Sequence, residues 1–127
     1  MAHLRSTGRL WPLAAALIAL WACDGGSAKP APLQAILHGS EAQSERLNAV
    51  RAWLGGRGVD VLYVQTDAKD IYNRTVLVVR TADVDSRERL LALTGIDTWI
   101  WARQEKPAAP FEIYVGDDIE ELMNTNR

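Results

Sequence analysis

The feature that most constrains this chain is an uncharged apolar run from Leu10 to Ala22, which ends at the only cysteine, Cys23. The run has thirteen residues, whereas a helix that crosses a bilayer needs about 20. Arg5 and Arg9 precede it, and no acidic residue does. A basic start followed by a short apolar segment is typical of a targeting signal, so we expect this segment to stay outside the folded domain.

The residues around the cysteine resemble the lipobox of bacterial lipoprotein signal peptides. That family has Leu three residues before the cysteine and Gly or Ala directly before it, and Leu20 and Ala22 match. The resemblance implies a signal peptide at residues 1–22 and acyl chains on Cys23. It also implies a protein of the bacterial cell envelope, anchored on the periplasmic side. Asp24 matches an inner-membrane retention signal of enterobacterial lipoproteins, but that rule varies between bacteria, so inner and outer membrane both stay open.

Two other interpretations of this segment stay open. One is an ordinary secretory signal or an uncleaved anchor, and the other is a cytosolic protein. In each of them the domain has to be stable without an internal disulfide, because the sequence holds a single cysteine.

The charge balance limits the partners of the mature chain. The whole chain has a formal charge of −2, and the predicted signal peptide takes two arginines away, so the mature chain is more acidic. Nucleic-acid binding needs a basic stripe, which the scattered charges do not provide. Adhesion to anionic lipid is disfavoured for the same reason. We therefore expect no nucleic-acid partner, and membrane contact through the acyl chains alone.

The chain divides into a tether and one domain. Residues 23–32 combine Gly and Ser with two prolines, a composition typical of a flexible linker. Residues 33–127 are long enough for a single domain with a modest core. Within that domain Ser40 and Gln43 have capping-box spacing at the start of a helix, and Gly55-Gly56 is expected to end it.

The apolar patterns predict an α+β fold. A second helix is expected from Asp83 or Asp85 to Gly95. Strands are expected at 33–38, 59–66, 71–80 and 97–103, with the second and third close enough for an antiparallel hairpin. The order β-α-β-β-α-β is that of the ferredoxin-like sandwich. Residues 111–115 alternate and predict an added C-terminal strand, and Gly116-Asp117-Asp118 is expected to cap a short tail helix.

No catalytic motif emerges from the sequence. The mature chain has one histidine, His38, expected where a strand meets a turn, and its only thiol is acylated in this interpretation. Asp67 with Asp70, Asp83 with Asp85, and the acidic group from Asp117 to Glu121 are explained by turns and helix caps. We therefore predict no enzyme activity, no cofactor and no metal site.

The aromatic residues are the stronger candidates for function. Trp99 and Trp101 are two residues apart in a predicted strand, so they share one face of the sheet. With Tyr114 and Tyr72 they are predicted to form an interaction surface on the face that the helices leave open, for a protein partner or a second copy. The alternative is that all four belong to the core.

Three classes of function stay open at this point. The first is an envelope protein that binds a partner or self-assembles. The second is a small lipoprotein enzyme or metal-binding module that uses His38 with nearby carboxylates. The third is an inhibitor or immunity-type domain that blocks a periplasmic enzyme. An exposed aromatic surface would favour the first and third, and convergence of His38 with carboxylates would favour the second.

Overall fold

The computed structural model describes residues 32–69 and 72–126. The predicted signal peptide, Cys23 and the tether up to residue 31 lie outside the described residues. The described part belongs to one compact unit, which begins at Pro32. None of its helices combines the length and the apolar character that a membrane span needs.

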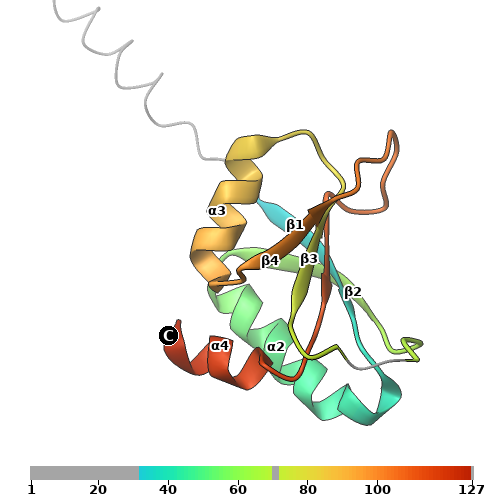
Figure 1. Cartoon of the computed structure of the whole chain (residues 1–127), viewed down its shortest axis with the longest axis vertical. Helices are drawn as coiled ribbons and strands as arrows, with labels where there is room; N and C mark the ends of the chain where they lie inside the picture. The colour runs from blue at the N-terminus through green and yellow to red at the C-terminus, as the bar shows by residue number, and fades with distance from the viewer. Residues whose placement is uncertain (1–31, 70–71, 127) are drawn as a thin grey trace, which may run out of the picture. The chain divides into compact units, whose positions relative to one another are not determined.

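The domain is a mixed α+β fold, as the apolar patterns predicted. Five strands and three α-helices are described, with a short 3-10 helix before the first α-helix (Figure 1). In chain order they are β1 (Leu33–His38), η1 (Glu41–Gln43), α2 (Ser44–Gly56), β2 (Val59–Gln65), β3 (Val76–Val79), α3 (Val84–Thr94), β4 (Thr98–Trp101), β5 (Phe111–Tyr114) and α4 (Ile119–Thr125).

The strands form one sheet in the order β2-β1-β5-β3-β4. β1 pairs in parallel with β2 through the crossover helix α2, and β3 pairs in parallel with β4 through α3. These are two βαβ units, each of which joins neighbouring strands. β5 lies between the two units, parallel to β1 and antiparallel to β3. The last strand of the chain therefore occupies the centre of the sheet.

The expected ferredoxin-like topology is not confirmed, and the predicted hairpin does not form. β2 is an edge strand, and both β1 and β5 lie between it and β3. β2 and β3 are close along the chain, which suggested a hairpin, but β2 pairs in parallel with β1 instead. β5 was expected as an addition to the fold. It is central because it pairs with β1 along one edge and with β3 along the other. Its side chains Phe111 and Ile113 are each 1% exposed on the helix side.

The core lies between the sheet and the helices, all of which cover one face (Figure 1). α2 contributes Leu47, Val50 and Leu54, which confirms the apolar stripe expected for this helix. Alternate residues of the strands point to the same side, as the two-residue period of a strand requires. The strand residues in this cluster are Leu33, Ala35, Leu37, Val59, Val61, Leu77, Val79, Phe111 and Ile113.

The local signals at the helix ends are largely confirmed. The Gln43 side chain accepts a hydrogen bond from the Ser40 backbone N–H at 2.9 Å, and the Asp83 carboxylate accepts one from Ser86 N–H. Gly95 ends α3 in the left-handed region, with φ 74°. The glycines expected to stop the first helix lie inside it, and Gly58, with φ 83°, takes the left-handed conformation instead.

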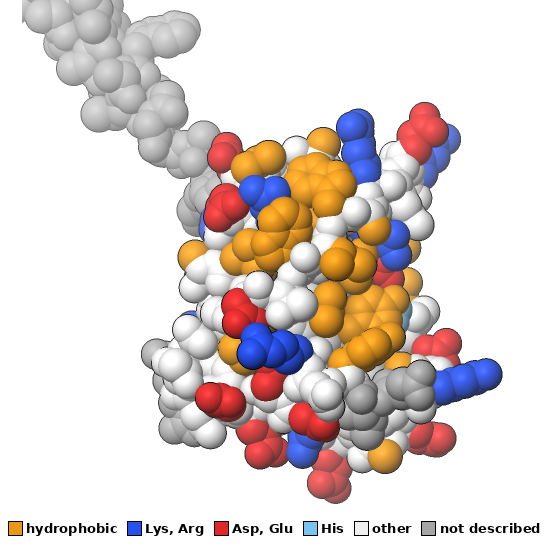
Figure 2. Space-filling view, viewed as in Figure 1, with side chains coloured by type: hydrophobic (Ala, Val, Ile, Leu, Met, Phe, Trp, Pro, Cys, Tyr) orange, Lys and Arg blue, Asp and Glu red, His pale blue; other side chains and the backbone are white. Residues whose placement is uncertain are grey.

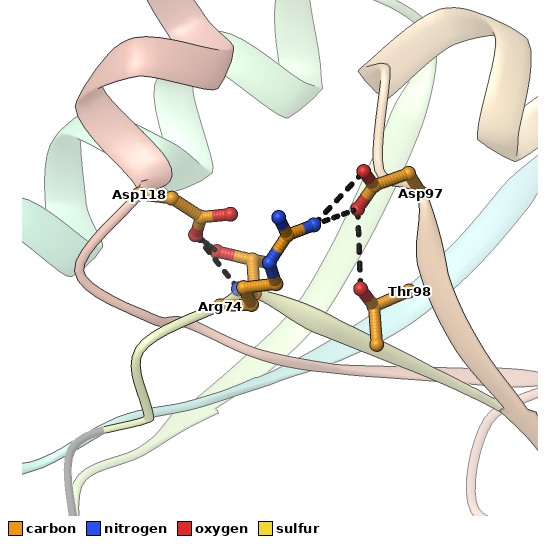
Figure 3. A network of polar contacts seen from close by, with 5 residues as sticks. Arg74, Asp97, Thr98 and Asp118 are labelled. Atoms are coloured by element: carbon orange, nitrogen blue, oxygen red, sulfur yellow. Dashed lines mark hydrogen bonds and ion pairs between the residues drawn. The ribbon is translucent and has the colours of Figure 1, made fainter.

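The tail helix is anchored to β3 by a polar network (Figure 3). Asp118 directly precedes α4 as predicted, but it does not cap the helix with its side chain. Its carboxylate accepts hydrogen bonds from the Thr75 N–H at 2.7 Å and from the Thr75 hydroxyl at 2.8 Å. The Thr75 Oγ1 in turn accepts one from the Gly116 N–H at 3.0 Å. This network fixes the end of β5 against the start of β3.

The same region holds an exposed ion pair. Arg74 Nη1 donates to both carboxylate oxygens of Asp97, at 3.2 and 3.0 Å (Figure 3). A hydrogen bond from the Thr98 hydroxyl and the pair with Arg74 hold the pKa of Asp97 below its ordinary value. Both side chains are largely in solvent, so the pair aligns the starts of β3 and β4 but contributes little stability.

Candidate interaction surface

Exposed apolar side chains gather around β4, one of the two edge strands of the sheet. Trp99, Ile100 and Trp101 are 37%, 52% and 45% exposed, and Tyr72 is 46% exposed. Figure 2 shows hydrophobic side chains over the region that β4 and β3 occupy in Figure 1. Monomeric proteins seldom leave several large apolar side chains together in water, so this edge is the leading candidate for an interaction site.

The structure does not place the four predicted surface residues on one face. Trp99 pairs with Leu77 and Trp101 with Val79, and both partners point into the core. The two tryptophans therefore lie on the helix side of the sheet. Ile100, which pairs with Val78, projects from the open face instead. The sequence could not decide this, because Thr-Trp-Ile-Trp offers an apolar residue to each face.

The tryptophans pack against an arginine of α3. The guanidinium of Arg87 lies 4.4 Å from the ring centroid of Trp99 and 5.3 Å from that of Trp101. The two indoles meet edge to face, with centroids 6.2 Å apart. The Arg87 side chain is only 15% exposed. The tryptophans thus extend the helix side of the domain toward the free edge and keep part of their surface in solvent.

The two tyrosines lie on the open face, as predicted, and line a groove there. Their rings meet edge to face, with centroids 5.9 Å apart. The groove has a volume of about 410 Å³. It is largely apolar, with a single charged side chain, and its lining residues are Tyr72, Val76, Val78, Arg80, Ile100, Ala102 and Tyr114.

A charged cluster adjoins the groove. His38 Nε2 lies 2.7 Å from Glu112 Oε1, and Arg80 Nε donates to Glu112 Oε2 at 2.5 Å. Arg80 Nη1 also donates to the Ala102 carbonyl oxygen at 3.1 Å. The three side chains come from the neighbouring strands β1 and β5 and the residue that follows β3. They are mostly buried, with His38 10%, Glu112 15% and Arg80 21% exposed.

The cluster keeps Glu112 ionised. Burial by itself would raise the pKa of Glu112, but the hydrogen bonds from Arg80 and His38 outweigh it and hold the pKa below its ordinary value. Burial and the neighbouring Glu112 carboxylate raise the pKa of Tyr114. The Tyr114 hydroxyl is therefore neutral at physiological pH, and the carboxylate accepts the hydrogen bond from His38.

The arrangement suits recognition better than catalysis. Arg80 and His38 already engage both oxygens of Glu112, which leaves the carboxylate little freedom to accept a proton from a substrate. Across the described residues, no three His, Cys, Asp or Glu side chains converge as metal ligands would. The predicted carboxylate pair at Asp83 and Asp85 lies at the start of α3, where Asp83 caps the helix.

Sequence reasoning missed Arg80 and Glu112. Their signal was faint: each is a charged residue within or beside an otherwise apolar strand pattern, and charges there need partners when buried. They are separated by 32 positions, so their pairing depended on the antiparallel register of β3 and β5.

The domain is a mixed α+β fold with an apolar edge strand and an open, aromatic sheet face. Searches against protein-family models, curated proteins and solved structures find no match to this chain.

Proposed function

We propose that this chain is a lipid-anchored protein of the bacterial cell envelope whose domain binds another protein or a second copy of itself. The anchor is Cys23, in the sequence that resembles a lipobox, and acyl chains on this residue would hold the domain at the periplasmic side of a membrane. The destination, inner or outer, is not part of the proposal.

The observation that carries the binding function is the apolar surface around β4. It has two parts, the groove lined by Tyr72, Tyr114 and Ile100 on the open face, and the exposed rims of Trp99 and Trp101 on the other. Aromatic side chains contribute large contact area at low entropy cost, which favours binding at such surfaces. An inhibitor or immunity-type domain is one form that this function can take.

Site-specific photo-crosslinking in living cells tests the proposal. A photoreactive amino acid in place of Tyr72 would lie at the groove, and the same amino acid in place of Ala52 would lie in an exposed position of α2. We expect a discrete protein adduct from position 72 and none from position 52. Absence of any adduct at position 72, with normal protein levels, would contradict a binding function for the groove.

Chemistry at His38 is the second candidate, and the 2.7 Å contact with Glu112 favours it. A metal-binding module would need His38 and Glu112 to release their present partners. Titration of the full chain with Zn²⁺, followed by NMR of the His38 ring, tests this function. Stoichiometric binding that His38→Gln abolishes would support it over the binding of a protein.

A further inference from the structure

β4 lacks the features that normally protect the edge of a sheet. Edge strands are usually blunted by charges, proline or a bulge, because their free backbone groups can pair with another chain. The residues of β4 are Thr-Trp-Ile-Trp, and none of these features occurs among them. In the part of the chain that the structure describes, β3 is the only strand paired with β4.

The opposite edge of the same sheet is protected. β2 carries the exposed charge of Asp60, and its pairing with β1 shifts register between Ala35 and Ile36, which leaves Leu62 as an extra residue. Such a bulge bends an edge away from regular pairing. β2 also exposes Leu62 and Tyr63, so the two edges differ in the charge and the bulge of β2 and not in apolar exposure.

The backbone groups that β4 offers belong to its tryptophans. The Ala102 N–H donates to the Val79 carbonyl at 2.9 Å, so Ala102 points inward to β3. In a parallel ladder, alternate residues direct both backbone groups to the same neighbour. Ile100 and Thr98 therefore also point inward. The N–H and C=O groups of Trp99 and Trp101 point outward.

We propose that two copies of this chain pair through β4, antiparallel about a two-fold axis at Ile100, to form one continuous sheet. In this register Trp99 of one copy lies opposite Trp101 of the other and exchanges two backbone hydrogen bonds with it. The two-fold axis repeats the exchange, which makes four hydrogen bonds. Ile100 of one copy lies opposite Ile100 of the other, so the two apolar grooves meet on the open face.

Charge selects this register over its neighbours. Pairing about Ile100 places the exposed Asp97 of each copy, which already pairs with Arg74 of its own chain, opposite the exposed Arg103 of the other. A shift of the axis to Trp101 would place Asp97 opposite Glu105, and a shift to Trp99 would place it opposite Trp101. Opposite charges across neighbouring strands stabilise a pair, and like charges destabilise it. The edge is therefore complementary to itself in one register.

A second copy is thus named as a partner within the proposed binding function. The pairing does not depend on the lipid anchor or on the groove at Tyr72. It adds the requirement that the outward backbone groups of Trp99 and Trp101 stay accessible. The paired edge is short, so the dimer should dissociate on dilution, and confinement to a membrane surface would favour it by raising the local concentration.

Cysteine crosslinking tests the register. In the full-length Cys23→Ser background, Ile100→Cys and Thr98→Cys each supply the only thiol of the chain. Residues opposite each other in a non-hydrogen-bonded pair have Cα atoms about 4.5 Å apart, within reach of a disulfide. The Cα atoms of Thr98 in the two copies would be roughly 13 Å apart, because these residues are offset by four positions along the strand. We expect disulfide dimers of Ile100→Cys and at least tenfold fewer of Thr98→Cys under mild oxidant.

A charge at the edge provides an independent test. Ile100→Lys places a charge on the two-fold axis, and the matched control Leu62→Lys places one at an exposed apolar position on the opposite edge. Analytical ultracentrifugation of the full chain in detergent should show a dimer for wild type and Leu62→Lys, and a monomer for Ile100→Lys. Circular dichroism should show that the Ile100→Lys monomer is folded. Equal crosslinking at positions 98 and 100, or a dimer that persists in Ile100→Lys, would overturn the proposal. An adduct to a different protein at position 72 would leave the wider binding function standing.

Discussion

The imidazole of His38 lies flat against the phenol ring of Tyr114, with centroids 4.2 Å apart and an angle of 6° between the ring planes. The two residues are opposite each other in the parallel pairing of β1 and β5. The stack places His38, which contacts Glu112, directly beside Tyr114, a lining residue of the aromatic groove. The charged cluster and the groove therefore share a packed boundary on the open face.

The first prediction concerns pH. The folded-state pKa of Glu112 is lowered from its ordinary 4.5, so ionised Glu112 stabilises the fold above that pH. This contribution should be lost as the pH falls below 4.5 through the lower folded value. Glu112→Gln should cost about 1.5–3 kcal/mol at pH 7, as expected for hydrogen bonds to a charged group. Urea unfolding of both proteins at pH 7 and in acid measures the effect.

Glu120→Gln is the matched control for this substitution. Glu120 pairs with Arg46 at 3.4 Å, and its side chain is 69% exposed. Such a pair is screened by solvent, so its loss should change stability by less than about 1 kcal/mol. A difference between wild type and Glu112→Gln that stays constant below pH 4.5 would contradict the assigned role of the carboxylate.

The second prediction concerns Gly116. A Cβ atom on this residue would collide with the backbone carbonyl group of Arg74, and a backbone cannot move aside as a flexible side chain can. Gly116→Ala should therefore destabilise the domain by about 2–3 kcal/mol, comparable to overpacking in a core. Thermal unfolding followed by circular dichroism measures the loss.

Gly55→Ala is the control for the same chemical change. Gly55 lies in α2, and nothing would contact an added Cβ. Alanine should stabilise the helix by about 0.5–1 kcal/mol because the unfolded chain loses freedom. Similar shifts for the two variants would show that the close approach at Gly116 is not tight.

The third prediction concerns the tryptophan pair. Both indoles pack on the guanidinium of Arg87, whose side chain is 15% exposed, so replacement of Trp99 and Trp101 with Thr removes these contacts. The double variant should lose at least about 2 kcal/mol through lost burial and cation–π contacts. Ile100→Thr, on the other face of the same strand, should cost under about 1 kcal/mol. Chemical denaturation of dilute protein compares them, and equal stabilities would show that the tryptophans contribute nothing to the fold.

The fourth prediction concerns Cys23. If the lipobox resemblance is correct, the wild-type chain should take up labelled fatty acid and partition into detergent, and Cys23→Ser should do neither. An acyl chain contributes about 0.8 kcal/mol for each buried CH₂, and stable attachment needs more than one chain. Equal labelling of the two proteins would exclude lipidation at this residue.

Much of the local structure followed from short stretches of the sequence. The capping pair Ser40 and Gln43, the cap at Asp83 and the stop at Gly95 each act within a few residues, so their chemistry is visible without a fold. The ranges of β1 and α3 were predicted closely for the same reason. The tail helix was also expected, although the Asp118 carboxylate binds Thr75 and not the helix end.

Strand order and the faces of β4 depended on tertiary structure. The alternation of residues 111–115 predicted a strand, but only its pairing with both β1 and β3 placed it at the centre. Trp99 and Ile100 are both apolar, so the pattern alone could not tell which one faces the helices, and the register with Leu77 decided it. The contact of His38 with Glu112 spans 74 positions. Local chemistry specifies short elements because their partners are near in the chain, whereas pairing between distant segments is decided by the packing of the whole sheet.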